Sequence, residues 1–409
     1  MNAFRKATSV VQLREAWRSK SKKLRASCFG VDRISASTFE EKLERNIRAL
    51  HRDLIDVEQP YKSSGLLAIA KRKPNSTKYR IICVPTLSDR LVQFSILQEL
   101  KPKLQAMGID NSVSYGIAEG RDKSVIGARV FACSARSKHP WVYKTDIQQF
   151  FDNLERDRLR EALSRVVKQP TLLPLIEKFI DTEITDGFDK RWRQIAVENG
   201  IVWGKGVRQG MPLSPLLAGA YLRDFDRQLA KSGVPVARYV DDIVAFFDTE
   251  AEAKGFHARI SDALAAIGLN IGEPNVSGSK TTITAPSQPA EFLGMEIAYK
   301  PGGGYRLQVS KTCIADAAQK LRDAGQIDYL LEKRISLTSM GRYFESVIQG
   351  YLNAYDAANN RDDLRIAITT AADTAQANVL KDLFGKKKLQ SLNDKQLRFV
   401  GINGRQLLS

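Results

Sequence analysis

Two adjacent aspartates, Asp241 and Asp242, constrain the fold of this chain more than any other feature, because both flanking segments have the character of β-strands. Residues 234–239 and 243–247 are apolar and rich in β-branched side chains, which favours a hairpin with the two acids at its tip. Uncompensated negative charge is costly to bury there, so the pattern points to an external cation. Mg2+ fits, because proteins hold it through one or two carboxylates and leave its other positions to phosphates and water. Taken alone, an Asp-Asp pair is more often an exposed turn.

A second acidic position lies upstream, where residues 141–145 have the pattern of a short strand that Asp146 closes. One isolated and one paired acidic site at strand ends are what a two-metal phosphoryl-transfer site requires. In such a site the two ions lie about 3.5–4 Å apart and stabilise the attacking and leaving oxygens. This reaction needs little side-chain acid–base chemistry, which suits a chain with three histidines.

A glycine-rich loop, residues 204–218, lies between these acidic positions. Gly204, Gly206 and Gly210 allow close approach of the backbone to another group. Two prolines, 212 and 215, then open an apolar helical run for which Ser214 is the expected N-cap. An ordinary junction between a loop and a helix would look the same.

Through about residues 30–300, in order, the chain resembles reverse transcriptases of the bacterial group-II-intron-like lineage. The resemblance covers these motifs: Gly30-Val31-Asp32 with Phe39; residues 71–73, 80–85 and 89–93; Ser114-Tyr115-Gly116 with Gly120-Arg121; residues 146–152; Arg208-Gln209-Gly210; Tyr239-Val240-Asp241-Asp242; Lys280-Thr281; and Phe292-Leu293-Gly294. Ile117-Ala118-Glu119 departs from the commoner Phe-Arg-Pro of the family.

This resemblance implies an α+β, right-hand polymerase fold with fingers, a palm whose antiparallel sheet carries the Asp-Asp hairpin, and a helical thumb. The expected domains are a basic N-terminal helical extension (1–30), fingers (31–135), palm (136–310) and a thumb or C-terminal region (311–409). Helices are expected over 159–167, 172–180, 250–267, 314–324, 337–357 and 364–383, with a tight turn over 301–305. In the N-terminal helix, Val10, Val11, Leu13 and Trp17 form a stripe expected to pack in the core, with RNA contact as the alternative.

The resemblance also implies roles for the acidic residues. Asp146 and Asp241 would ligate both Mg2+ ions, with help from the Ile147 carbonyl, and Mn2+ could substitute. Asp242 would maintain the electrostatics and geometry of the site through a weaker or indirect metal contact. Together, Asp146, Asp241 and Asp242 are the expected catalytic residues.

Further roles concern the nucleotide. Arg80 and Lys71 are expected to clamp its triphosphate, by bidentate and point-charge contacts respectively, although Lys73 is close enough to leave the choice of Lys71 open. Gln209 would contact the incoming nucleotide or its templating partner, and Tyr239 belongs to the same nucleotide site.

The position of Phe151 is that of an aromatic steric gate, which would exclude a 2′-hydroxyl and favour dNTPs. One of Phe150 and Phe151 is expected to be a core residue, because alternate residues of a strand face opposite sides. Lys280 is either a proton donor to pyrophosphate or a solvated lysine. Asp89, Arg90 and Asp152 are expected to be structural or to contact the template.

Composition agrees with a nucleic-acid partner. The formal net charge is +17, and the basic residues are spread along the chain, which fits a duplex-binding cleft better than a targeting tail. Four cysteines without metal-site or disulfide spacing indicate a reducing cytoplasm. No apolar run approaches the roughly 18 residues of a membrane span, and the N-terminus lacks a signal-peptide core, so no membrane partner is expected.

Residues 350–355, 382–385 and 397–402, with no sign of endonuclease or RNase H ligands, resemble the stand-alone defence-associated reverse transcriptases of bacteria. That likeness implies a non-coding RNA template, a cDNA product acting against phage, and second-strand synthesis on DNA. A retron or group-II-intron-type enzyme and an RNA-binding protein with a vestigial polymerase site are alternatives. An RNA-dependent RNA polymerase is a further one, against which Phe151 argues. The template, the priming hydroxyl (RNA, DNA or protein) and the oligomeric state are left open by the sequence.

Overall fold

The computed structural model describes residues 2–72, 79–185 and 190–399. The chain divides into two compact units. Unit 1 consists of residues 1–128 and 143–283, and unit 2 of residues 129–142 and 284–409. The four-domain division expected from the sequence stays a prediction. Among the described helices, none is long and apolar enough to cross a membrane.

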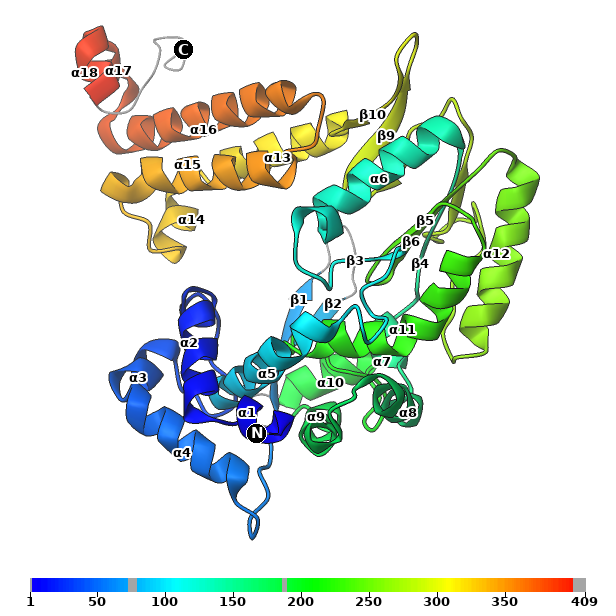
Figure 1. The fold of residues 1–409 in the computed structure, drawn as a ribbon. Helices are drawn as coiled ribbons and strands as arrows, with labels where there is room; N and C mark the ends of the chain where they lie inside the picture. The colour runs from blue at the N-terminus through cyan, green and yellow to red at the C-terminus, as the bar shows by residue number, and fades with distance from the viewer. Residues whose placement is uncertain (1, 73–78, 186–189, 400–409) are drawn as a thin grey trace. The chain divides into compact units, whose positions relative to one another are not determined.

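Unit 1 begins with four helices; the first two pack on a buried helix that comes later in the chain, and the other two pack on the second helix (Figure 1). These are α1 (Ala3–Ala7), α2 (Val10–Arg25), α3 (Ala36–Glu41) and α4 (Leu43–Ile55), followed later by the buried α5 (Leu87–Leu100). The predicted core stripe is confirmed for Leu13 and Trp17, which are buried, but it is wrong for Val11, which is 71% exposed. The buried face of α2 runs through residues 13, 16, 17 and 24, and Val11 does not share that helical spacing.

Strands β1 (Leu66–Arg72) and β2 (Tyr79–Pro85) form an antiparallel hairpin. The register pairs Leu66 with Pro85 at one end and Lys71 with Arg80 near the other. Ile184 adds a parallel bridge to Leu66, so a later segment extends this small sheet.

A five-stranded sheet in the order β3-β5-β6-β4-β7 carries the acidic residues. Its strands are β3 (Ser114–Tyr115), β4 (Trp141–Asp146), β5 (Val236–Tyr239), β6 (Asp242–Phe247) and β7 (Thr282–Thr284). The β5–β6 hairpin and the β4 strand occur where the sequence predicts them. Ile243, Val244 and Ala245 of β6 are fully buried, which explains the apolar run after the aspartates.

The helices between these strands are α6 (Val125–Lys138), α7 (Phe150–Asn153), α8 (Arg156–Val166), α9 (Leu173–Ile180), α10 (Lys190–Glu198), α11 (Ser214–Lys231) and α12 (Glu250–Ala265). Three short 3-10 helices also occur in unit 1: η1 (Lys101–Lys103), η2 (Arg121–Lys123) and η3 (Pro170–Leu172). The predicted helices at 159–167, 172–180 and 250–267 are confirmed as α8, α9 and α12. A capping box of Thr249 and Glu252 fixes the start of α12.

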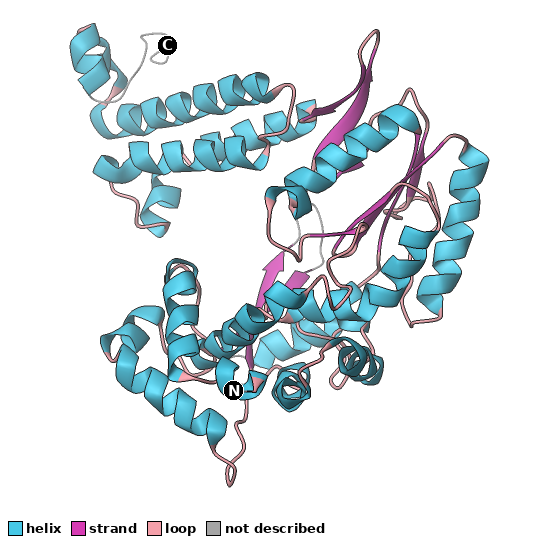
Figure 2. Cartoon of the chain, viewed as in Figure 1, coloured by secondary structure: helices cyan, strands magenta, loops and turns pink. Residues whose placement is uncertain are grey.

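Unit 2 combines a three-stranded sheet with helices (Figure 2). The strands are β8 (Ala290–Phe292), β9 (Met295–Lys300) and β10 (Gly304–Gln308), and the predicted turn lies between β9 and β10. The helices are α13 (Lys311–Asp323), α14 (Ile327–Glu332), α15 (Leu337–Ala354), α16 (Arg361–Phe384), α17 (Lys386–Gln390) and α18 (Asp394–Phe399). Helix α16 packs on both α13 and α15, so the three predicted C-terminal helices are confirmed, while α14, α17 and α18 were not predicted. Residues 400–402 lie outside the described part.

Candidate active site

The tip of the β5–β6 hairpin carries the paired aspartates. Tyr239 and Asp242 form the last cross-strand pair, which leaves Val240 and Asp241 as the turn. Val240 has φ +59°, an unfavourable conformation for a β-branched residue. The guanidinium of Arg238 donates a hydrogen bond of 2.8 Å to the Val240 carbonyl and therefore holds this turn.

Asp146 lies beside this tip, as the sequence predicts. The backbone N–H of Ile147 donates to the Asp241 carbonyl at 3.1 Å, which joins the end of β4 to the hairpin. Burial, followed by the charges of Asp146 and Asp242, raises the pKa of Asp241 to about 6. Burial also raises the pKa of Asp242, an effect that Lys144 and Lys280 oppose. Three carboxylates therefore share one strongly negative site.

Lys280 contacts this site. Its Nζ lies 2.6 Å from Oδ2 of Asp146, although the lysine side chain is 70% exposed. A buried hydrogen bond of 2.7 Å between the hydroxyls of Thr145 and Thr281 fixes the neighbouring residues. Of the two interpretations left open by the sequence, the contact favours a lysine that belongs to the site.

The donor set suits magnesium, with one qualification from the geometry. Within the described residues, no three Asp, Glu, His or Cys side chains converge into a ready-made cation site. Mg2+ does not require one, because it binds through one or two carboxylates and keeps water or substrate oxygens in its other positions. The carboxylates of Asp146 and Asp241 would meet that need, and the Ile147 carbonyl stays an expected third ligand. Burial, followed by the neighbouring carboxylates, raises the pKa of Asp241, and a divalent ion would compensate the charge of those carboxylates.

The two adjacent phenylalanines differ in burial, as expected. Phe150 is 2% exposed and belongs to the core, whereas Phe151 is half-buried, with its ring 5.3 Å from that of Phe150. The reason predicted for this was wrong: both residues lie in the short helix α7, not on a strand, after Gln149 has turned the chain with φ +46°. Phe151 stays the candidate for the steric gate.

The Gln209 loop is tied to the β1–β2 hairpin. The N–H of Cys83 donates to the Gln209 carbonyl at 2.7 Å. A Cβ on Gly210 would come within 2.4 Å of the Cys83 carbonyl oxygen, and one on Gly206 within 2.6 Å of the Asp152 carbonyl oxygen, so these two glycines allow close approach as predicted. Gly204 has open space around it, and its positive φ of 81° is what favours glycine there.

The expected cap at Ser214 was wrong. Helix α11 begins at Ser214 itself, after Leu213 as the N-cap residue, and the Ser214 hydroxyl donates to the Arg208 carbonyl at 2.9 Å. The serine thus fastens the loop instead of capping the helix.

Lys71 and Arg80 stand directly opposite each other across the β1–β2 hairpin, and both are exposed. Like charges in this position repel, so an anion between them would be stabilising. Lys73, the alternative to Lys71, lies outside the described residues. The two predicted triphosphate contacts therefore come from one hairpin.

Tyr239 is packed against the Ser-Tyr-Gly motif of residues 114–116. Gly116 has φ +86°, and a Cβ there would lie 2.7 Å from an edge carbon of the Tyr239 ring. Only glycine leaves room for this ring. The motif therefore supports the hairpin that carries the aspartates.

Asp89 and Arg90 have structural contacts, which agrees with the first of the two roles expected for them, a structural role or contact with the template. Asp89 is fully buried and accepts hydrogen bonds from Tyr61, Ser63 and Thr86. Arg90 donates to the Ser27 hydroxyl at 2.5 Å. The carbonyl of Asp152 lies against Gly206 of the loop, which gives this residue a structural contact as well.

Sequence reasoning missed two ion-pair systems around this site. Arg238 pairs with Asp226 of α11, and Glu183 pairs with both Arg156 and Arg208. Arg238 directly precedes the Tyr239–Asp242 motif and Arg208 belongs to the Arg208-Gln209-Gly210 motif, which was the available signal, whereas nothing in the local sequence distinguishes Glu183.

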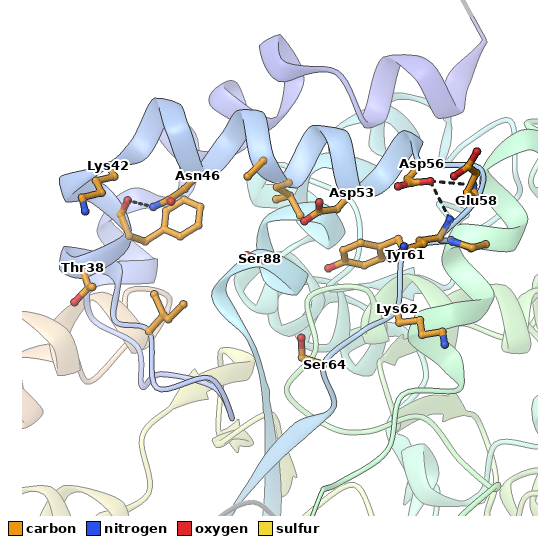
Figure 3. A pocket seen from close by; sticks show the side chains of 16 residues that line it. Thr38, Lys42, Asn46, Asp53, Asp56, Glu58, Tyr61, Lys62, Ser64 and Ser88 are labelled. Carbon is orange, nitrogen blue, oxygen red and sulfur yellow. Dashed lines mark hydrogen bonds between the residues drawn. The ribbon is translucent and has the colours of Figure 1, made fainter.

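A large cavity lies elsewhere in the described part of the chain, between α3, α4 and the segment that follows them (Figure 3). It has a volume of about 950 Å3 and includes Lys42, Asp53, Tyr61 and Ser88 in its lining. None of the predicted catalytic or nucleotide-binding residues lines it.

Unit 1 thus combines an acidic hairpin tip with a cationic hairpin that is tied to a glycine-rich loop, and these are groups that metal-assisted nucleotidyl transfer would use. The chain matches the reverse transcriptase (RNA-dependent DNA polymerase) family over residues 69–297, more than half of its length, and it belongs to that family. It therefore carries the domain of an RNA-directed DNA polymerase, with the right-hand polymerase fold.

Curated relatives agree at low identity. The chain is 28% identical over 203 residues to the group II intron-encoded protein LtrA of Lactococcus lactis subsp. cremoris, covering 49% of this chain and 31% of the relative. It is 24% identical over 204 residues to protein YkfC of Escherichia coli (strain K12), covering 49% of each chain. The match thus spans half or less of these relatives.

Solved structures with some similarity include a partial Cas6-RT-Cas1–Cas2 complex, with 22% identity, a TM-score of 0.36, and coverage of 65% of this chain and 42% of that one. Another is apo telomerase from Candida tropicalis, with 16% identity, a TM-score of 0.42, and coverage of 94% and 71%.

Proposed function

We propose that this protein is an RNA-directed DNA polymerase that copies an RNA template into cDNA by two-metal nucleotidyl transfer. The observation that carries the proposal is that backbone hydrogen bonds in unit 1 connect three parts: the acidic site, the opposed cations Lys71 and Arg80, and the Gln209 loop. The loop is bound to the cationic hairpin through Cys83, and the N–H of Val207 donates at 2.7 Å to the carbonyl of Phe151, in the segment that follows Asp146. Membership of the reverse transcriptase family supports the same conclusion.

Each side chain then has a task. Asp146 and Asp241, with the Ile147 carbonyl, would hold two Mg2+ ions, or Mn2+ in their place, and Asp242 would maintain the field around them. When bound by these residues, the ions would supply activation of the attacking hydroxyl and neutralisation of the leaving oxygens. Lys280, already at Asp146, would pass a proton to the departing pyrophosphate.

The nucleotide would be selected by the remaining residues. Lys71 and Arg80 would bind its triphosphate, and Gln209 and Tyr239 would position its base and sugar against the template. Phe151 would occupy the space of a 2′-hydroxyl and so favour dNTPs over rNTPs.

The biological role follows from family likeness and net charge. A charge of +17 suits an RNA template and a cDNA duplex as partners. We propose a cognate non-coding RNA as the template and antiphage defence in the bacterial cytoplasm as the role, with DNA-templated second-strand synthesis as a further step. The proposed domains are the N-terminal extension (1–30), fingers (31–135), palm (136–310) and thumb (311–409).

A group-II-intron-type role is the second candidate, favoured by the match to the intron-encoded protein LtrA. It shares the chemistry but requires an intron RNA as the partner. An RNA-binding protein with a vestigial site is less well supported, because all three aspartates are present.

The decisive experiment is to sequence the nucleic acid that co-purifies with the wild type and with an Asp241→Ala/Asp242→Ala variant. One abundant RNA in both, with matching cDNA only in the wild type, is the expected result and would name the template. RNA in both with cDNA in neither, also during phage infection, would contradict polymerase function. An intron RNA in the complex would favour the second candidate.

A further inference from the structure

Glu183 is the centre of a charged cluster next to the Gln209 loop. Its Oε2 accepts hydrogen bonds from the Nε and one terminal nitrogen of Arg208, at 2.9 and 2.7 Å. Its Oε1 accepts from Arg156 at 2.6 Å and from the N–H of Gly204 at 2.8 Å. Arg208 is fully buried and Arg156 nearly so. One carboxylate thus pairs with two buried guanidinium groups, and for Arg208 it is the counter-charge, while Arg156 also has Asp181 at 3.8 Å.

The backbone of Glu183 belongs to the β1–β2 hairpin. The N–H of Leu66, the first residue of β1, donates to the Glu183 carbonyl at 2.9 Å, and the N–H of Thr185 donates to the Leu66 carbonyl at 3.2 Å. Strand β1 also carries Lys71. Glu183 therefore has its main chain on the hairpin that is proposed to bind triphosphate.

The side chain of Glu183, in contrast, fixes the loop. Arg208 also donates to the Val202 carbonyl at 2.8 Å, and its own carbonyl accepts from Ser214. Arg156 donates to the Gly206 carbonyl at 3.0 Å. Because Gln209 directly follows Arg208, these contacts determine where Gln209 can lie.

Loss of the carboxylate would leave the buried Arg208 without its counter-charge, whereas Arg156 would keep Asp181, whose Oδ1 lies 3.8 Å from it. A buried charge left without its partner is strongly unfavourable. We expect the loop of residues 202–210 to shift in response, because it carries Arg208 and its two ends, 202–205 and 209–210, are exposed or half-buried. Its displacement would carry Gln209 away from the β1–β2 hairpin.

We propose that Glu183 is a positioning residue that sets the place of Gln209 relative to the Lys71–Arg80 pair, and thereby the affinity for the incoming dNTP. This inference rests on the proposed polymerase function. Glu183 does not contact substrate; it acts through Arg208 and the loop.

The test compares single-nucleotide incorporation by the full-length protein on a defined RNA template with a DNA primer. The variants are Glu183→Gln, Gln209→Ala, the two combined, and Glu99→Gln as the matched control. Glu99, like Glu183, is a carboxylate that pairs with two cations, here Lys6 and Lys103, but it lies on α5 outside the proposed site. Glutamine keeps the size of the side chain and removes its charge.

Glu183→Gln is expected to raise the KM for dNTP about tenfold, while kcat should change less than about twofold. A tenfold change corresponds to the loss of about one hydrogen bond to a charged group, here the contact that a displaced Gln209 would no longer make. In the Gln209→Ala background the same substitution should raise the KM by less than about twofold more, since both act on one contact. Glu99→Gln should lower the melting temperature without raising the KM. A lower melting temperature with an unchanged KM for Glu183→Gln, or independent effects of the two substitutions, would overturn the inference.

Hydrogen exchange of the backbone amides at residues 203–210 gives a readout that does not require activity. Exchange should be faster in Glu183→Gln and unchanged in Glu99→Gln. If the wild type incorporated no dNTP, the proposed function would fail, and this exchange would still decide whether Glu183 positions the loop. Unchanged exchange in Glu183→Gln would refute the positioning role in either case.

Discussion

Arg238 and Asp226 form an ion pair in which both side chains are fully buried. The Nε of Arg238 donates to Oδ1 of Asp226 at 2.6 Å, and another nitrogen of the same guanidinium holds the Val240 carbonyl. This pair connects helix α11 to the turn that carries Asp241. The geometry of the acidic site therefore depends on a residue that does not touch it.

Replacing Arg238 by methionine should lower the free energy of unfolding by about 3–5 kcal/mol, because Asp226 would be left buried without its cation. Urea unfolding measures this. Arg14→Met is the matched control, since Arg14 pairs with Glu44 at the surface and its loss should have a much smaller effect. Equal losses in the two variants would contradict the importance given to the buried pair.

Asp241→Asn should stabilise the metal-free protein at pH 8 by up to about 3 kcal/mol. The pKa of Asp241 is raised from 3.8 to about 6 in the folded protein, so its charged form is disfavoured there. The folded state binds this proton more tightly than the unfolded state, and stability is therefore lost as the pH rises from about 4 to about 6. The gain from asparagine should be absent below that window and complete above it.

Unfolding in a chelator across this pH range gives the measurement for Asp241→Asn. A destabilised variant at pH 8 would refute the expectation. With Mg2+ added, the wild type should gain stability and the variant should gain less, because metal binding selects the folded state.

Phe151→Ala should raise the use of rNTPs relative to dNTPs by about tenfold or more, since it removes the ring proposed to exclude the 2′-hydroxyl. The ratio of kcat/KM for the two nucleotides is the readout. Phe150→Leu is the control, and it should lower stability while leaving the ratio unchanged, because Phe150 is a core residue. An unchanged ratio in Phe151→Ala would remove the gate assignment.

Lys280→Ala should slow the chemical step by about 100-fold if the lysine donates a proton to pyrophosphate. Rapid-quench measurement of one incorporation separates this step from product release. The melting temperature should hardly change, because the lysine is 70% exposed and its ion pair with Asp146 is screened by solvent. A wild-type rate in the variant would show that Lys280 serves charge balance alone.

The parts of the fold that the sequence predicts best are local. The β5–β6 hairpin, the end of β4 and the long helices follow from short patterns of apolar and polar residues, which act over a few positions. The predicted N-cap at Ser214 was wrong because the Ser214 hydroxyl forms a tertiary hydrogen bond with the Arg208 carbonyl instead. The predicted burial of Val11 was wrong because the face of the helix that packs in the core contains Leu13 and Trp17 but not Val11.

Glu183 shows what a single sequence does not contain. Its partners Arg156 and Arg208 lie 27 and 25 positions away, and the contact depends on the path of the loop between them. Similarly, the opposition of Lys71 and Arg80 depends on the hairpin register, which the sequence between them does not reveal.

The close approach of Gly116 to Tyr239 also bears on how this protein can change over generations. A Cβ at position 116 would collide with the ring of Tyr239, whereas one at Gly120 would meet nothing within 4 Å. A side chain at 116 would need a smaller residue at 239, next to the turn that carries Asp241, and would still be strained by the φ of +86° at this position. Position 116 is therefore constrained twice, and among descendants of this sequence Gly116 should be retained wherever Tyr239 is.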